Sequence, residues 1–460
     1  MSPWSWTSAS ATTGGTPSRL VELLRSRRLL YIFLGVYAVT LLLLIPGKPL
    51  WMDEIIDLNG VRDADLRGVL AFVPGNAGGV PLGYLVDFWM IRLFGYSEFV
   101  VRLLSALFTV LTCAGVYMLA RQTTLRGPLL AAILYAVSPL TVRYALEARP
   151  YAQAACWSVF STAVFLSLIR RPTFGKAAGY AVLVAAGLFT QPYSIFVPVA
   201  HLIWLLSTSS VKEKPRAILL AGTAVALAGV AFLPWYFKAH AIWQGAVGSG
   251  VRFFVTGKDL LVIPHELMGT GYLGAALTGI AIVVALAWSS WNKEEKILWV
   301  LYAAIPLILV PVADAYFGYF LAARQMIFAL VPISVVLIAC MEVRLGWLLP
   351  VALCIAMIYE DVRWMRRPGE GWQAAATQLK GADCSVFVPS GARTMYVFFE
   401  PQLRVCDENS LTTVGTVALA LSPDQYEDVF TDARQKLGRA GFHKVADVRI
   451  ANPRIELYRR

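Results

Sequence analysis

Charged residues are scarce in this chain. Asp, Glu, Lys and Arg make up 15% of its 460 residues and hydrophobic residues 58%, whereas roughly a quarter of a soluble globular protein is charged. The deficit lies in apolar runs long enough to cross about 30 Å of hydrocarbon. Such runs must be helical, because a lipid interior offers the backbone no water. The composition therefore predicts an α-helical polytopic membrane protein.

Acidic residues are the minority among the charges, with 29 Asp and Glu against 40 Lys and Arg and a net charge of +11. In a soluble domain this balance would suggest nucleic-acid binding. Here the basic residues cluster in short islands between apolar runs, as the positive-inside rule expects of cytoplasmic loops. We therefore expect membrane lipids, and no nucleic acid, among the partners.

Cysteine and histidine are few, six and four respectively, and no CxxC or His-rich zinc spacing occurs. Cys384 and Cys406 lie in the polar C-terminal region and could form a disulfide if that region is extracytoplasmic. The other cysteines lie in apolar runs and are expected to be small buried hydrophobes: Cys113, Cys156, Cys340 and Cys354.

The N-terminus resembles a signal peptide, with several Arg residues before the apolar run Leu29–Ile45. No small-residue cleavage site follows at Pro46–Trp51, so a retained signal anchor is predicted. Residues 1–28 are expected to be cytoplasmic, with a disordered Met1–Pro17. Short-loop charges then predict about eleven spans within a transmembrane module, 29–359. Two long outer loops are predicted in this module, at residues 47–97 and 238–269.

The last hundred residues are more polar. Helix periodicity over Pro423–Leu437, with Ser422 as N-cap, accompanies four candidate strands. The strands are Cys384–Pro389, Val417–Leu421, Val445–Ile450 and Arg454–Tyr458. Residues 360–460 are therefore predicted to form an extracytoplasmic α/β domain. The whole chain is expected in the bacterial inner (plasma) membrane, with its active site on the non-cytoplasmic side.

An acidic pair, Asp53-Glu54, follows the first span directly. Acidic residues at a membrane edge cost little, so these could be solvated loop carboxylates. Their apolar neighbours, from Trp51 to Ile56, instead favour a packed functional site. The pair could also bind a divalent cation, but two carboxylates are too few to decide this, and no cofactor is firmly implied.

Further polar residues fall at the same predicted face. Glu147, Arg149 and Tyr151 occupy a short outer loop, where a simple ion pair is the alternative. Arg324 lies at the mouth of a late span and could snorkel to the interface or bind a lipid phosphate. The remaining candidates are Gln191 and Tyr193 in a tight outer turn, and the weaker Lys258 and His265 in the second outer loop.

Several short segments, in order, resemble the GT-C glycosyltransferases of the protein O-mannosyltransferase and aminoarabinose-transferase type. The match covers about residues 29–340. Its segments are Asp53-Glu54, Pro81-Leu-Gly-Tyr84, Phe94-Gly-Tyr-Ser-Glu98, Arg102-Leu-Leu-Ser-Ala106, Glu147-Ala-Arg-Pro-Tyr151, Leu188-Phe-Thr-Gln-Pro-Tyr193, and Arg324 before Phe328–Pro332.

The resemblance implies an inverting transfer of a monosaccharide, hexosyl or pentosyl, from a polyprenyl-phosphate donor to a glycan, lipid or protein acceptor. It implies that Asp53 is the base toward the acceptor, supported by Glu54 and Glu147, and that Arg324 holds the donor phosphate. Catalysis of this kind needs a cation at the phosphate and a carboxylate at the attacking hydroxyl.

Two positions depart from the family pattern. Gly79 stands where aminoarabinose transferases carry a Lys, which puts the aminoarabinose substrate in doubt, and Gln191 replaces the usual His. Two other classes of function stay open. A transporter or lipid flippase would place ionisable groups near the bilayer midplane, where this chain has few. A polysaccharide polymerase or ligase would centre on Arg-rich outer loops.

Overall fold

The computed structural model describes residues 25–76, 79–122, 127–208, 214–248, 253–289, 291–342, 346–406, 410–422, 427–449 and 453–460. The disorder predicted for Met1–Pro17 and the helix start predicted at Pro423 lie outside the described residues. Two compact units emerge. The first combines Met1–Ile45 with Val69–Trp364, and the second combines Pro46–Gly68 with Met365–Arg460. The predicted boundary at residue 360 stays a prediction.

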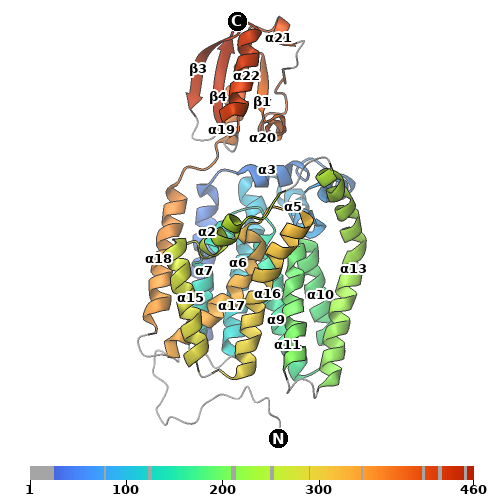
Figure 1. Ribbon diagram of the computed structural model, residues 1–460, viewed down its shortest axis with the longest axis vertical. Helices are drawn as coiled ribbons and strands as arrows, with labels where there is room; N and C mark the ends of the chain where they lie inside the picture. The colour runs from blue at the N-terminus through green and yellow to red at the C-terminus, as the bar shows by residue number, and fades with distance from the viewer. Residues whose placement is uncertain are drawn as a thin grey trace. The chain divides into compact units, whose positions relative to one another are not determined.

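Most helices of the first unit run side by side (Figure 1). They are α2 (Arg27–Leu44), α6 (Glu98–Gln122), α7 (Pro128–Ala136), α8 (Pro139–Ala145), α9 (Tyr151–Arg170), α10 (Phe174–Thr190), α11 (Phe196–Ser207), α13 (Pro215–Gly248), α15 (Gly271–Trp288), α16 (Lys293–Phe317), α17 (Leu330–Ile338) and α18 (Leu348–Arg366). The other elements up to residue 342 are η1 (Ile45–Gly47), α3 (Met52–Asn59), α4 (Leu66–Phe72), η2 (Val73–Gly75), α5 (Pro81–Phe94), η3 (Pro192–Ile195), α14 (Gly257–Met268), η4 (Ala323–Ala329) and η5 (Ala339–Glu342).

The predicted helical membrane fold is confirmed, but the count of eleven spans is not. Among the described residues, seven helices are long and apolar enough to cross a membrane, or eight if the pair α7 and α8, bent by 65°, is one span. Two predicted spans correspond to α10 and α11, which have 17 and 12 residues. The length of α10 lies at the lower end of the roughly 17–25 residues that a crossing needs, and α11 forms one apolar helix with η3, Pro192–Ser207, which is slightly shorter.

The regions predicted as long outer loops are partly helical. Helices α3, α4 and α5 occupy much of 47–97, and α5 begins at Pro81, whose fixed φ suits a first turn. In the second region α13 continues to Gly248, and α14 follows. Helix α14 begins with a reciprocal cap, in which the Thr256 amide donates to Asp259 at 2.7 Å and the Asp259 amide to the Thr256 hydroxyl at 3.4 Å.

The second unit contains a four-stranded sheet of order β1-β2-β4-β3. Strands β1 (Cys384–Val388) and β2 (Thr416–Leu421) are parallel, and β4 (Arg454–Arg459) pairs antiparallel with β2 and with β3 (His443–Arg449). Helix α22 (Glu427–Arg439) covers one face (Figure 1). The remaining helices are α19 (Trp372–Leu379), η6 (Ser390–Ala392), α20 (Arg393–Phe399) and α21 (Ser410–Thr413). The predicted α/β domain is thus present.

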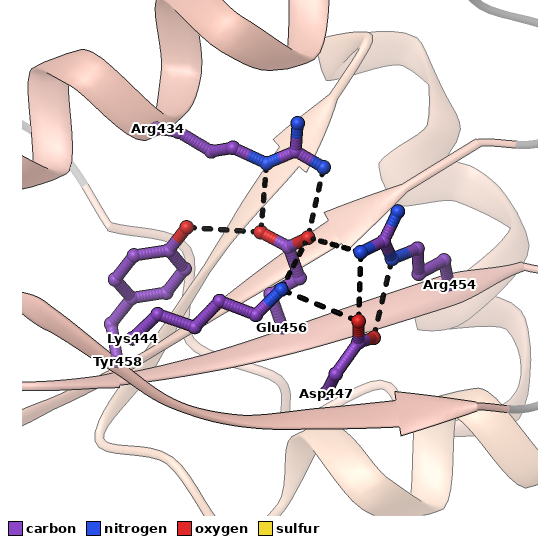
Figure 2. Close-up of polar contacts among 6 residues, drawn as sticks. All are labelled: Arg434, Lys444, Asp447, Arg454, Glu456 and Tyr458. Atoms are coloured by element: carbon purple, nitrogen blue, oxygen red, sulfur yellow. Dashed lines mark hydrogen bonds and ion pairs between the residues drawn. The ribbon is translucent and has the colours of Figure 1, made fainter. Parts of the chain in front are cut away.

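A buried carboxylate ties α22 to the sheet (Figure 2). Glu456 on β4 is 0% exposed and accepts hydrogen bonds from Arg434 Nε at 3.0 Å and Nη2 at 2.9 Å. Lys444 Nζ and the Tyr458 hydroxyl donate at 2.9 Å each. Burial alone would raise the pKa of Glu456, but these donors outweigh it and lower the pKa from 4.5 to about 2.

The pairing left open for Cys384 and Cys406 is present as a disulfide. It joins β1 to the segment that runs beside it, where the Cys406 amide also donates to the Ser385 carbonyl at 2.9 Å. The other four cysteines are free thiols, three buried and one half-buried. As predicted, they lie within apolar helices.

Candidate active site

The residues predicted as a site divide between the two units. Asp53 and Glu54 belong to the second unit, and all the other candidates belong to the first. In the first unit, the short connection from α8 to α9 carries Glu147, which is 5% exposed. The Arg149 amide donates to the Glu147 carbonyl at 2.9 Å, which closes the connection into a tight turn. A Cβ on Gly83 of α5 would lie 3.1 Å from Pro150, so α5 packs closely on this turn.

Glu147 forms an ion pair that the sequence analysis did not single out. Arg143 Nε donates to Glu147 Oε1 at 2.9 Å, across one helical turn. The Glu147 side chain is 6% exposed but that of Arg143 is 41% exposed, so the guanidinium reaches solvent while the carboxylate does not. Arg143 and Glu147 are four residues apart in the sequence, a spacing that favours such an ion pair in helical segments. The sequence therefore contained a signal for this pair.

Tyrosine rings and a second guanidinium flank this pair. Tyr144 and Tyr151 meet edge to face, with ring centroids 4.7 Å apart. The Arg149 guanidinium lies 5.6 Å from the Tyr151 ring centroid. Tyr144, Tyr151 and the Arg149 guanidinium thus lie around the turn that carries Glu147, and the role of these residues as a site stays a prediction.

Arg324 joins these residues from a distant part of the chain. It lies on η4, which packs against α8 and α9, and it interacts electrostatically with both Arg143 and Tyr144. Its guanidinium also lies 5.1 Å from the Phe320 ring centroid. We call this group of three cations and one carboxylate the arginine corner. Its members are Arg143, Arg149, Arg324 and Glu147.

The guanidinium groups of the arginine corner have a chemical consequence. Arg324 acts electrostatically on Arg143, and Glu147 offsets this repulsion. Guanidinium groups are forked donors that bind phosphate or carboxylate oxygens in pairs. The arginine corner is therefore suited to an anion, and phosphate is the anion that its donors match best.

The turn with Gln191 and Tyr193 holds a second polar pair. The Tyr193 hydroxyl donates to Asp314 Oδ1, and Asp314 is 0% exposed. Asp314 lies near the end of α16 and was missed, because it follows an apolar run that hides a single acid. Gln191 ends α10, and its carbonyl accepts from the Ser194 amide at 2.9 Å.

The weaker candidates lie on α14, which packs against α8 and η4. A Cβ on Gly269, the left-handed residue that ends α14 at φ +67°, would lie 2.4 Å from Pro139, so this end of the helix touches the start of α8. Lys258 is exposed at the opposite end. His265 is half-buried, with its ring centroid 4.9 Å from that of Tyr272.

In the second unit, the acidic pair occupies the first turn of α3. Glu54 is 0% exposed, and its Oε2 accepts from the Trp51 amide at 3.2 Å, which caps its own helix. Asp53 is partly exposed. The two acids therefore differ, because Glu54 is engaged by the backbone while Asp53 is the more accessible carboxylate.

Comparison with known proteins reveals relatives in fold. Residues 81–235 match the family model of dolichyl-phosphate-mannose-protein mannosyltransferase. Apo ArnT from Cupriavidus metallidurans aligns with a TM-score of 0.62 at 15% identity, over 93% of this chain and 97% of ArnT. The same protein bound to undecaprenyl phosphate aligns at 0.57 and 14% identity, over 94% and 98% of the two chains. This chain has the GT-C fold. A search of curated protein sequences finds no match.

More distant members of the GT-C fold align as well. The archaeal oligosaccharyltransferase AglB from Archaeoglobus fulgidus, in complex with an inhibitory peptide and a dolichol-phosphate, aligns with a TM-score of 0.50 at 9% identity. The alignment covers 92% of this chain and 74% of AglB. The resemblance to GT-C glycosyltransferases predicted from short motifs is thereby confirmed at the level of fold.

Within this GT-C fold, Gly79 stands in a backbone arrangement that leaves no room for a side chain. A Cβ there would lie 1.8 Å from the Val73 carbonyl oxygen. The Gly79 carbonyl also accepts from Trp235 Nε1 at 3.0 Å, which fixes the segment against α13. A Lys at this position would require a different backbone, so its absence here is built into the local structure.

Metal binding finds no support in the arrangement of ligands. Among the residues that the structure describes, no group of three or more His, Cys, Asp or Glu side chains could hold a metal ion. Glu54, one half of the acidic pair, already accepts a backbone hydrogen bond. The divalent cation that the sequence left open is therefore not assigned to any residues.

Proposed function

We propose that the chain is an inverting glycosyltransferase that moves a monosaccharide from a polyprenyl-phosphate donor, of the undecaprenyl type, to a glycan, lipid or protein acceptor. The observation that carries the proposal is the arginine corner. Its three guanidinium groups, one of them paired with Glu147, suit the phosphate of a lipid-linked sugar. The GT-C fold, and a GT-C relative bound to undecaprenyl phosphate, support the choice of donor.

The chemistry follows from the leaving group. The acceptor hydroxyl oxygen attacks the anomeric carbon as the bond from that carbon to the phosphate oxygen breaks, and the polyprenyl phosphate departs with the electron pair. Guanidinium groups that hold the phosphate stabilise this developing charge. We assign the hydroxyl proton to the carboxylate of Asp53, the more accessible member of the acidic pair. Attack opposite the leaving group inverts the anomeric carbon.

We place the reaction on the non-cytoplasmic side of a bacterial inner membrane. Short-loop charges orient the predicted spans that way. The disulfide between Cys384 and Cys406 supports the same side for the C-terminal domain, because disulfides persist in oxidising compartments.

The test uses the purified full chain in lipid nanodiscs with a panel of radiolabelled polyprenyl-phosphate sugars. Turnover of at least one donor is expected. Arg324→Lys keeps a cation but loses the fork, so the donor KM should rise about tenfold or more, and Arg324→Ala should raise it further. The exposed Arg171 serves as the matched control, since Arg171→Lys should leave KM unchanged. Equal KM values for Arg324→Lys and wild type would indicate that Arg324 extends to the membrane interface and does not bind the donor phosphate.

A further inference from the structure

The helix that carries the acidic pair is held by the C-terminal domain. Glu370 Oε2 accepts a hydrogen bond from the backbone amide of Met52 at 2.7 Å. Met52 is the first residue of α3, so the Glu370 carboxylate caps a helix that lies more than three hundred residues earlier in the chain. A carboxylate at this end also interacts favourably with the helix dipole.

Glu370 is itself fixed by the core of its domain. The same oxygen accepts from Trp372 Nε1 at 2.5 Å. Trp372 is 1% exposed and meets Tyr396, which is 0% exposed, edge to face at 5.3 Å. The capping oxygen therefore has little freedom, because its second donor is an indole locked between α19 and α20.

Arg62 makes a second attachment beyond the other end of α3. Its Nη1 donates to the Phe398 carbonyl at 2.6 Å, and its guanidinium lies 4.1 Å from the Phe398 ring centroid. Helix α3 also packs against α20. Before the helix, Lys48 Nζ donates to the Arg367 carbonyl. The acidic helix is thus held at both ends by residues of 365–460.

We propose that Glu370 is a positioning residue for the reaction, and that the C-terminal domain serves to hold α3 and with it the Asp53 carboxylate. The inference rests on the proposed function, because only a reaction that uses Asp53 gives this attachment a catalytic consequence. A base must be held in register with the proton that it accepts, and a misplacement of about 1 Å can cost about 10²-fold in rate.

Two readouts test the proposal on the full chain in nanodiscs. Glu370→Ala removes the cap, and hydrogen exchange of the α3 amides should accelerate about fivefold or more. The exchange of β2 should stay unchanged. The same variant should lose about 10²-fold in kcat while the donor KM changes by less than about threefold. Glu370→Gln keeps an acceptor oxygen and should recover most of both effects.

The control is Asp432→Asn, which removes a carboxylate from an exposed ion pair with Lys436 in the same unit. It should change neither readout. If α3 exchange is unaltered in Glu370→Ala, Glu370 does not hold α3. If exchange accelerates but kcat stays at the wild-type value, Glu370 holds α3 without positioning a catalytic group. A wild-type chain that transfers no sugar would instead refute the proposed function. The exchange result would still show whether Glu370 holds α3.

Discussion

Removal of the buried charge at Glu456 should loosen the C-terminal domain. Glu456→Gln keeps the shape of the side chain but removes the negative charge that Arg434, Lys444 and Arg454 share, and only Lys444 and Arg454 also contact Asp447. The pKa of Glu456 falls from 4.5 to about 2 on folding. At about 1.4 kcal/mol per pKa unit, this corresponds to about 3 kcal/mol at neutral pH. Breaking a buried ion pair costs a comparable amount, about 3–5 kcal/mol.

The lower figure is the better expectation, because the side chains of Arg434 and Arg454 are 24% and 45% exposed and water can solvate them after the change. A loss of about 3 kcal/mol is about 10²-fold in the opening equilibrium of the domain. Local opening is the correct observable, since a chain with two compact units has no single two-state stability.

The assay is hydrogen exchange of β2 and β4 in the full chain. At pH 7 these amides should exchange about 10²-fold faster in Glu456→Gln than in wild type, while α6 in the first unit keeps its rate. Because the folded pKa is lowered, the contribution of Glu456 is present above pH 4.5 and is lost as pH falls toward 2. The variant should lack this acid response. Exchange within about threefold of wild type at pH 7 would refute the energetic reasoning, and Asp432→Asn again provides the control.

Three further changes test other parts of the molecule. Asp53→Asn should fold normally and lose about 10²–10⁴-fold in transfer rate, and near-wild-type turnover would exclude Asp53 as the base. Reporter fusions at Glu370 and Lys212 should lie on opposite sides of the membrane. Finding both reporters on the same side would contradict the predicted topology. Tyr193→Phe leaves the buried Asp314 without its phenol donor. Hydrogen exchange of α16 should then accelerate by the equivalent of about 1–3 kcal/mol of local stability, and unchanged exchange would indicate that the carboxylate finds another partner.

Much of the fold could be predicted because hydropathy is a local property. Apolar runs revealed α2, α6 and α9 nearly residue by residue, and β-rich segments revealed all four strands of the C-terminal sheet. The number of spans could not be read in this way. An apolar run shows that a helix is buried in lipid or protein but does not give its exact length, and α10 and α11 are apolar helices shorter than the seven candidate spans among the described residues.

Polar residues buried inside the first unit were harder to foresee. His201 on α11 is 0% exposed, with the Tyr180 hydroxyl 2.9 Å from its Nδ1 and the Thr162 hydroxyl 3.1 Å from its Nε2. Its ring also stacks on Phe165 at 4.3 Å. Both ring nitrogens are thus satisfied by neutral partners, which is the arrangement of a packed structural group rather than of an ion pathway through the bilayer.

The features that matter most for the proposed chemistry join residues far apart in the chain. Arg143 approaches Arg324 across 181 positions, and Glu370 caps Met52 across 318. No periodicity or spacing rule reaches that far, so a single sequence can nominate each residue but cannot pair it. The two long-range contacts also differ in kind. The first sets like charges against each other, and at Arg143 the nearby Glu147 offsets the repulsion. The second satisfies a helix end and is favourable by itself. Forked cationic donors that come together from distant parts of the chain suit a phosphate, and the arginine corner is therefore where the search for the donor phosphate should begin.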